Sequence, residues 1–282
     1  DHAKRLMANI PKDIPRGYLF GLPIAVKDLS NVSGVRTTMG SPIYADHIPQ
    51  KSSYSVQALE KNGAIVLAKS NTPEFGAGAN TFNEVFGKTL NPWDTRTTCG
   101  GSSGGSAAAL AAGQVWLATG SDLGGSLRIP ASFCSIVGMR PSPGRVPQGP
   151  KDFPFATLSV DGPMGRTVGD VAIMLDAMAG FHPDDPLSFP APIDSYLRST
   201  EHRSQPYRLA FSSNLGIAPV DCEVAEICKR AVKLFDGSGV QIENATIDLH
   251  DAREIFQTLR ASQFSASMGP LLTSHRDQLK PE

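Results

Sequence analysis

The sequence predicts an α/β fold in which helices cover a sheet. Short apolar segments typical of strands alternate with longer helical patterns along most of the chain. Three of the helical patterns end at a glycine, the residue that most readily ends a helix. With 282 residues the chain can bury a large core, roughly three quarters of its unfolded surface, so we expect one large domain over residues 1–282.

The first half of the chain alternates strand and helix. Residues 24–26 are apolar enough for a buried strand, and Asn62-Gly63 ends the next helix in a C-cap position. The stretch 88–99 is polar and rich in turn residues, which predicts a loop. In order, we expect a strand at 24–26, a helix at 53–62, a strand at 64–68, a loop at 88–99, a helix at 107–112 and a strand at 115–119.

The second half opens with a sequence typical of a helix start. Thr167 and Asp170 have capping-box spacing, and the helix predicted from Val168 to Ala179 ends at Gly180. Its core-facing residues are expected to be Val168, Val171, Ala172, Leu175 and Met178. Further along, we expect a proline-rich surface connection at 183–192, a strand at 207–211, a helix at 224–235, a strand at 240–242 and mostly helix over 251–279.

Composition and charge exclude several classes of function. The formal net charge is −1 with scattered Lys and Arg, so we expect a small substrate and no binding to nucleic acid or an anionic membrane. Four cysteines are too sparse for a disulfide framework, which favours a reducing, cytoplasmic setting. No run approaches the ~18 apolar residues of a membrane span. The chain starts without Met, and we therefore expect a truncated sequence.

The most informative segment sets several serines among glycines. It runs from Cys99 to Ala109, and a further Gly-Gly-Ser follows at 124–126. A serine in a glycine-rich turn is typical of a catalytic nucleophile. Upstream, an apolar run ends in Lys27, a candidate base that is not a histidine. The six histidines lack metal-ligand spacing, so no metal is expected.

Each of these features also has another interpretation. Residues 100–105 begin like a phosphate-binding loop, but Ser106 and Ala107 stand where its lysine and hydroxyl belong. Residues 100–104 also match a nucleophile elbow, although 88–99 does not provide the strand that the elbow requires. A flexible linker and a solvated lysine at a strand end are alternatives that the residues alone leave open.

Four motifs together resemble the amidase signature family. The resemblance covers residues 21–186, and residues 187–282 are less diagnostic. It implies a mixed central sheet covered by helices on both faces, truncated at both ends because family members are usually considerably longer. The motifs are Gly21-Leu22-Pro23 with Lys27-Asp28, Gly100–Ser106, Gly120–Ala131 and Val137–Pro141, with a weaker extension at Asp161–Asp170.

The resemblance also implies a Ser-Ser-Lys triad. Ser126 matches the acylating nucleophile, Ser102 the bridging serine that follows a cis peptide bond, and Lys27 the base. The two serines are 24 residues apart, the spacing associated with the family. Ser103 is the adjacent alternative to Ser102. Ser121 stands where the family is expected to have Thr, a change that keeps the hydroxyl.

The residues around the triad are expected to support it. A lysine base must be desolvated, because a free lysine with a pKa near 10.4 is almost fully protonated at pH 7. The apolar residues 24–26 make burial of Lys27 plausible. We expect an oxyanion hole from the backbone N–H groups of Leu123, Gly124, Gly125 and Ser126, and supporting roles for Ser103, Asp122 and Arg128.

The resemblance implies an amidohydrolase that converts a small linear carboxamide to a carboxylic acid and ammonia or an amine through a seryl acyl-enzyme. It implies no cofactor, no direct contact with nucleic acid and no membrane, and a homodimer is left open. One alternative is the glutaminase-type A subunit of a tRNA-dependent amidotransferase, which works with partner subunits. The other, from a different class, is a non-catalytic fragment.

Overall fold

The computed structural model describes residues 3–4, 8–151, 153–201 and 207–280. Contacts within the chain divide it into two compact units. Unit 1 comprises Asp1–Glu201 together with Pro270–Glu282, and unit 2 comprises His202–Gly269. Each unit is described by itself. In the described ranges, no helix combines the length and apolar character that crossing a bilayer requires.

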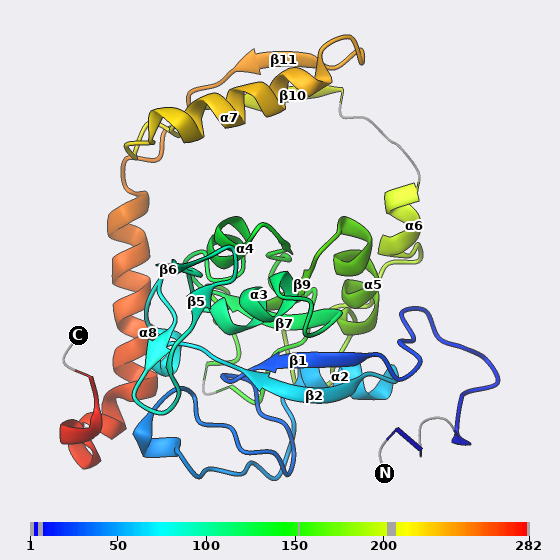
Figure 1. The fold of residues 1–282 in the computed structure, drawn as a ribbon, viewed down its shortest axis with the longest axis vertical. Coiled ribbons are helices and arrows are strands. Elements are labelled where there is room, and N and C mark those ends of the chain that lie inside the picture. Colours follow the sequence, from blue (N-terminus) through cyan, green and yellow to red (C-terminus); the bar gives the residue numbers. More distant parts are fainter. Residues whose placement is uncertain (1–2, 5–7, 152, 202–206, 281–282) are drawn as a thin grey trace. The chain divides into compact units, whose positions relative to one another are not determined.

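Unit 1 is built on a mixed five-stranded sheet (Figure 1). The strand order is β2-β1-β7-β9-β8. Strand β1 pairs in parallel with both β2 and β7, whereas β9 runs antiparallel to β7 and β8 antiparallel to β9. The strands are β1 (Pro23–Lys27), β2 (Ile65–Ser70), β7 (Leu117–Asp122), β8 (Val137–Gly138) and β9 (Val160–Gly165).

Helices cover both faces of this sheet, as the sequence predicts. Ile24 and Val26 of β1 belong to a core cluster that includes residues of α2 (Tyr54–Lys61) and α5 (Val168–Met178). Ala25, which lies between them and points to the opposite face, belongs to a second cluster. That cluster includes residues of α3 (Gly104–Ala111) and α4 (Arg128–Cys134). The predicted fold class is therefore confirmed.

Helix ends follow the local signals. Asn62 is the C-cap of α2, and Gly63 next to it has a φ of +78°, a left-handed conformation that favours glycine. Thr167 and Asp170 form the predicted capping box at the start of α5. Val168, however, was predicted to face the core and is 61% exposed. It is the first residue of α5, and the buried residues of the helix begin only at Val171.

The stretch 88–99 contains a hairpin where a loop is expected. Strand β5 (Leu90–Asn91) pairs antiparallel with β6 (Asp94–Thr98), and the side chains of β6 are mostly exposed. Without a buried face, β6 shows no apolar alternation, which is why the sequence pattern missed it. A second small hairpin joins β3 (Phe82–Asn83) to β4 (Gly87–Lys88).

The remaining elements of unit 1 are short. Residues 183–192 form no helix or strand, but Asp185 within them is buried, so this connection does not lie wholly on the surface. Its carboxylate accepts a hydrogen bond from the backbone N–H of Gln148. The unit also contains α6 (Tyr196–Glu201) and 3-10 turns at Pro42–Tyr44, Glu74–Gly76 and Arg276–Gln278.

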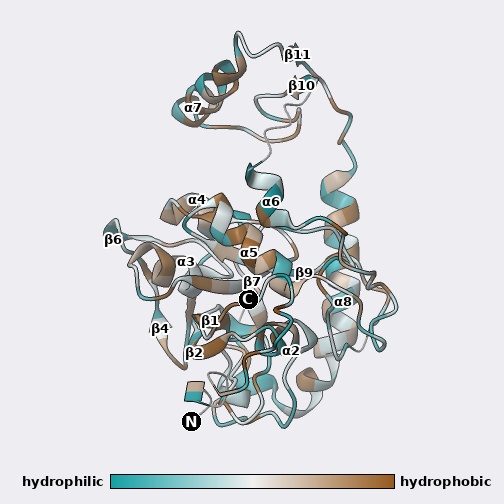
Figure 2. Cartoon of the chain, turned by 90° about the vertical axis from the view of Figure 1, so that its right-hand side faces the viewer, coloured by the Kyte–Doolittle hydropathy of each residue, from teal (hydrophilic) through white to brown (hydrophobic). Residues whose placement is uncertain are grey.

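In unit 2, β10 (Arg208–Phe211) pairs in parallel with β11 (Gln241–Asn244). These are the strands predicted at 207–211 and 240–242. Between them in the sequence lie α7 (Cys222–Val232) and a 3-10 turn at Lys233–Phe235. Helix α8 (Ala252–Ser274) follows, and its residues from Pro270 onward belong to unit 1. Asp221 caps α7 by accepting from the N–H of Glu223. The helix has no buried residue and carries both hydrophilic and hydrophobic residues on its surface (Figure 2).

Candidate active site

Lys27 ends β1 with its side chain fully buried in unit 1. Its Nζ lies 2.7 Å from Ser102 Oγ and donates a hydrogen bond to Ser121 Oγ at 3.0 Å. The buried residues Ile24 and Val26 precede it on the strand, so the apolar approach noted in the sequence does carry the lysine into the interior. The interpretation of Lys27 as a solvated strand end is therefore wrong.

Burial changes the charge state of this lysine. Desolvation lowers the pKa of Lys27 from 10.5 to about 7, although the nearby carboxylates of Asp161 and Asp122 oppose the shift. At neutral pH a large share of Lys27 is then the free amine, which a base requires.

The glycine-serine segment is folded into the core and is not a linker. Ser102 and Ser103 immediately precede α3 and are buried, and the Gly101–Ser102 peptide bond is cis. Ser103 Oγ contacts the backbone of Ser121 at 3.3 Å and thereby attaches the segment to β7. The N–H of Ser103 donates to the carbonyl of Ser126 at 3.2 Å, so the second glycine-serine loop lies directly beside the first.

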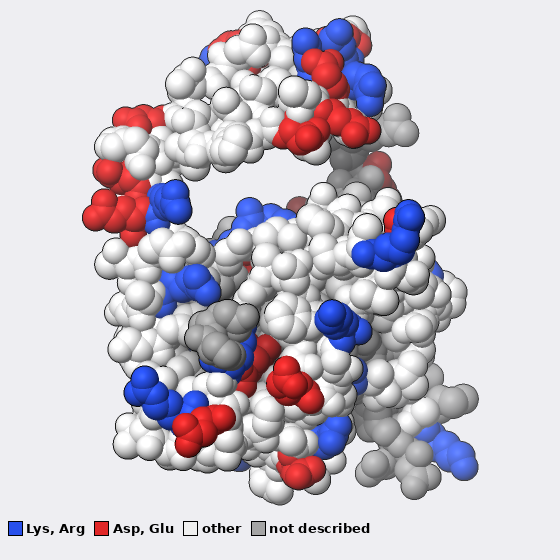
Figure 3. All heavy atoms as spheres, turned by 60° about the vertical axis from the view of Figure 1, so that its left-hand side comes forward, with Lys and Arg blue, Asp and Glu red and all other residues white. Residues whose placement is uncertain are grey.

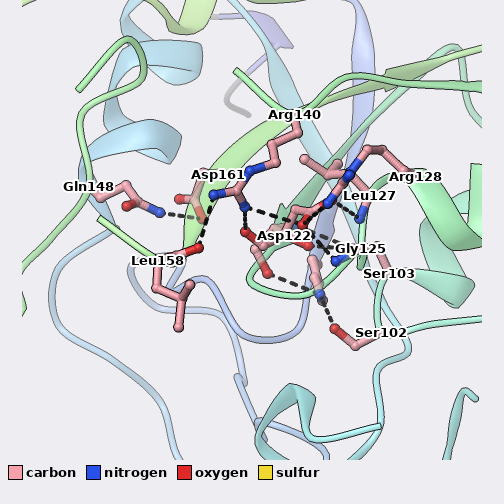
Figure 4. Close-up of polar contacts among 12 residues, drawn as sticks. Ser102, Ser103, Asp122, Gly125, Leu127, Arg128, Arg140, Gln148, Leu158 and Asp161 are labelled. Carbon is pink, nitrogen blue, oxygen red and sulfur yellow. Dashed lines mark hydrogen bonds and ion pairs between the residues drawn. The ribbon is translucent and has the colours of Figure 1, made fainter. Parts of the chain in front are cut away.

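Asp122 anchors that second loop. The carboxylate is fully buried at the end of β7 and accepts hydrogen bonds from Arg128 at 2.9 Å and 3.1 Å and from Arg140 at 3.2 Å (Figure 4). It also accepts from the backbone N–H groups of Gly125 and Leu127. Burial alone would raise the pKa of Asp122, but these hydrogen bonds lower it below its usual value, so the group is ionised.

This anchoring reduces the set of N–H groups expected to form an oxyanion hole. The N–H of Gly125 donates to Asp122 Oδ1 at 2.8 Å, so in this structure it is directed at that carboxylate. Among the backbone hydrogen bonds found for the described residues, none uses the N–H of Leu123, Gly124 or Ser126. Gly125 itself has a φ of +114°, a turn conformation that a side chain would strain.

Two residues of the site were not predicted from the sequence. Arg140 pairs with Asp122 and donates to the carbonyl of Leu158. Asp161 accepts hydrogen bonds from Ser55 Oγ at 2.7 Å and Gln148 Nε2 at 3.2 Å. Both residues belong to the quoted motifs, at Val137–Pro141 and Asp161–Asp170, but a motif does not indicate which strand will lie beside it.

In the described part of the chain, no three His, Cys, Asp or Glu side chains come close enough to hold a metal ion. Cys99 and Cys134 are buried free thiols, and burial raises the pKa of Cys134 to about 12, which makes it a poor nucleophile. On the face drawn in Figure 3, charges of both signs are interspersed.

The glycines of α3 permit a close approach that positions Ser102 and Ser103. A Cβ on Gly105 would lie 2.2 Å from the backbone N of Asn71, so we expect Gly105→Ala to lower the free energy of unfolding by about 1–3 kcal/mol. The matched control is Gly169→Ala in α5, where the nearest atom to an added Cβ is 3.7 Å away. Alanine there should raise stability by ~0.5–1 kcal/mol. Urea denaturation measures both, and equal midpoints for the two variants would contradict this packing.

A desolvated lysine bonded to one serine, with a second serine in an adjacent glycine-rich loop, is the arrangement that a serine–lysine hydrolase needs. Residues 1–269 match the Amidase family model. The acylamidase of Rhodococcus erythropolis is 43% identical over 230 residues, which are 82% of this chain and 48% of that protein. The glutamyl-tRNA(Gln) amidotransferase A subunit of Trichodesmium erythraeum is 39% identical over 244 residues, 86% of this chain and 50% of that protein.

The solved structures agree with the sequence matches. A bacterial aryl acylamidase of the amidase signature enzymes superimposes with a TM-score of 0.88 at 27% identity, covering 99% of this chain and 59% of that one. The chain thus belongs to the amidase signature family. It spans about half the length of the curated relatives it matches.

Proposed function

We propose that the protein is an amidase that hydrolyses the carbon–nitrogen bond of a small linear carboxamide through an acyl-enzyme on Ser126. The observation that carries this proposal is the buried Lys27 Nζ, 2.7 Å from Ser102 Oγ, with a pKa near neutrality. The hydrogen bond from Ser103 N–H to the carbonyl of Ser126 supports the proximity of Ser126 to this pair. No cofactor enters the proposed reaction.

In the proposed reaction, neutral Lys27 takes the proton of Ser102 while Ser102 takes the proton of Ser126. The Oγ of Ser126 forms a bond to the carbonyl carbon, and the carbonyl oxygen becomes an oxyanion. The C–N bond then breaks as the proton returns through the same groups to the leaving nitrogen. Water, deprotonated by the same relay, hydrolyses the ester and releases the acid.

The oxyanion hole that we propose uses the N–H groups of Leu123, Gly124 and Ser126. A well-placed donor of this kind contributes roughly 3 kcal/mol to catalysis in other enzymes. The N–H of Gly125, predicted as a fourth donor, instead holds the loop in shape through Asp122. Arg128 supports the loop indirectly, because it neutralises the buried carboxylate of Asp122.

A glutaminase-type amidotransferase A subunit is the second candidate, since several relatives carry that name. The acylamidase is favoured by its 43% identity over 82% of this chain and by the TM-score of 0.88 for an aryl acylamidase. Amidotransferase A subunits reach 41% identity over 80% of this chain, and a structure of one has a TM-score of 0.77. Only this second candidate function involves partner subunits.

The proposal treats residues 1–282 as one functional domain, because the family match over residues 1–269 crosses both compact units. It also assigns the protein to a reducing, cytoplasmic environment, for which the four free cysteines are the support. Fractionation of the source cells tests this assignment, and recovery from an oxidising compartment would contradict it.

A substrate screen tests the proposed reaction. Aliphatic amides, anilides and glutamine are incubated with the protein, and release of acid, ammonia or amine is measured with Ser126→Ala as the blank. We expect the wild type to hydrolyse an amide or anilide, and we expect no hydrolysis with the Ser126→Ala blank. Turnover of glutamine alone, with co-purifying subunits, would favour the amidotransferase. A folded chain that neither turns over substrate nor labels with a fluorophosphonate would favour the non-catalytic fragment.

A further inference from the structure

Asp161 lies opposite Ser121, whose hydroxyl group accepts a hydrogen bond from Lys27. Ser121 of β7 and Asp161 of β9 are directly opposed in the antiparallel pair, and opposed residues place their side chains on the same face. Ser121 Oγ accepts the 3.0 Å hydrogen bond from Lys27 Nζ. Lys27, Ser121 and Asp161 therefore follow one another across three neighbouring strands, β1, β7 and β9.

Two carboxylates act on Lys27, and their surroundings differ. Asp122 is neutralised by the guanidinium groups of Arg128 and Arg140. Asp161 instead receives its hydrogen bonds from two uncharged groups, the hydroxyl of Ser55 on α2 and the amide of Gln148. Asp161 is thus paired with no guanidinium group, unlike Asp122, and both carboxylates oppose the lowering of the Lys27 pKa, Asp161 more than Asp122.

Among the described residues, a second cation, Lys151, also faces Asp161, and Lys151 is itself faced by the carboxylate of Asp185. Lys151 Nζ donates to Gln148 Oε1 at 2.6 Å, and the Gln148 amide donates to Asp161, so the two charged groups are linked through one side chain. Burial raises the pKa of Asp161, while Ser55, Gln148, Lys151 and Lys27 oppose that shift.

We propose that Asp161 is a positioning residue for Lys27: its carboxylate stabilises the positive charge that Lys27 acquires when it takes the proton of Ser102. This inference rests on the proposed amidase function. Without Asp161, Lys27 would lose its proton at a lower pH but would be a weaker base once neutral. In the pH–rate profile, the midpoint of the acidic limb would therefore move to lower pH, and the plateau rate would decrease. A merely structural role would not produce this combination.

The test uses the full chain and measures the rate at which a fluorophosphonate labels Ser126 from pH 5 to 10, by intact mass. For Asp161→Asn we expect the midpoint of the acidic limb to fall by about one pH unit and the plateau rate to fall by about tenfold. Asp161→Glu keeps the charge and should restore the wild-type midpoint. The matched control is Asp176→Asn, which removes a buried carboxylate of α5 that caps Ser195–Leu197. It should lower stability but leave the midpoint unchanged.

A second variant keeps the inference testable if Asp161→Asn does not fold. Lys151→Met removes the other cation that faces Asp161, so the midpoint should move in the opposite direction, to higher pH. Unchanged midpoints in the folded variants would overturn the role of Asp161 and leave the proposed function intact. A wild-type chain that is not labelled on Ser126 would overturn both. Labelling with shifted midpoints but no amide turnover would contradict only the proposed function.

Discussion

Replacement of Ser126 by alanine is expected to abolish acyl-enzyme formation and to lower amide turnover by at least about a thousandfold, because it removes the oxygen that forms the acyl bond in the proposed reaction. The fold should persist, since the change removes one oxygen from a partly exposed turn. Fluorophosphonate labelling followed by intact-mass measurement reports the adduct, and urea denaturation reports the fold.

Other serines of the chain provide the controls for this variant. Ser213→Ala, at an exposed position of unit 2, should keep full labelling. Ser102→Ala should reduce labelling far more than Ser103→Ala, because Ser102 contacts Lys27 whereas Ser103 contacts the backbone of Ser121. A fluorophosphonate adduct on the Ser126→Ala protein would overturn the assignment of the nucleophile.

Lys27→Met is the second large change that we expect. It should lower amide hydrolysis by about a thousandfold or more, but hydrolysis of an activated ester much less, because a good leaving group needs no proton. The ratio of the two rates measures this difference. As a control, His182→Ala should leave the ratio unchanged. If His182→Ala impaired turnover as much as Lys27→Met, the Ser-Ser-Lys scheme would have to be abandoned.

The same variant should be more stable than the wild type at neutral pH. The pKa of Lys27 is about 7 in the folded protein and 10.5 when unfolded, so between these values the unfolded chain binds a proton that the folded chain does not. Wild-type stability therefore rises with pH across this window, and Lys27→Met lacks that contribution. We expect Lys27→Met to gain stability of order 4 kcal/mol at pH 7. Equal stability at pH 7 would show that Lys27 carries no desolvation cost.

Much of the fold could be predicted because local signals coincide with burial. The run before Lys27 predicts a buried strand, and the strand carries the lysine inside. The capping box at Thr167 and the glycines after α2 and α3 define helix ends through backbone geometry that is local to a few residues. Such features need no knowledge of distant contacts.

The elements that were missed depend on distant parts of the chain. Strand β9 contains two glycines and Pro163, and it becomes a strand because it pairs along all six residues with β7. Helix α4 contains Pro130 in its first turn, where a missing N–H is tolerated. The sequence could not indicate that β9 would bring Asp161 beside Ser121, because strand register depends on the whole sheet.

The candidate site, like the fold, has features that could be predicted from the sequence and features that could not. The resemblance to the family implies the proposed triad, and the structure brings two of its residues, Lys27 and Ser102, into contact. The set of oxyanion donors could not be deduced, because the hydrogen bond from the N–H of Gly125 to Asp122 depends on how the loop turns after β7. Asp122 was predicted as a supporting residue, but its second arginine, Arg140, comes from the segment after α4.

The central claim is that neutral Lys27 is the base. Its most direct test is kcat/KM from pH 5 to 10 for wild type and Lys27→Met, with an amide and an activated ester as substrates. We predict that the wild-type acidic limb has its midpoint near pH 7, the pKa of Lys27, and that this limb is absent in Lys27→Met. An identical acidic limb in both proteins would show that another group is the base and would contradict the account.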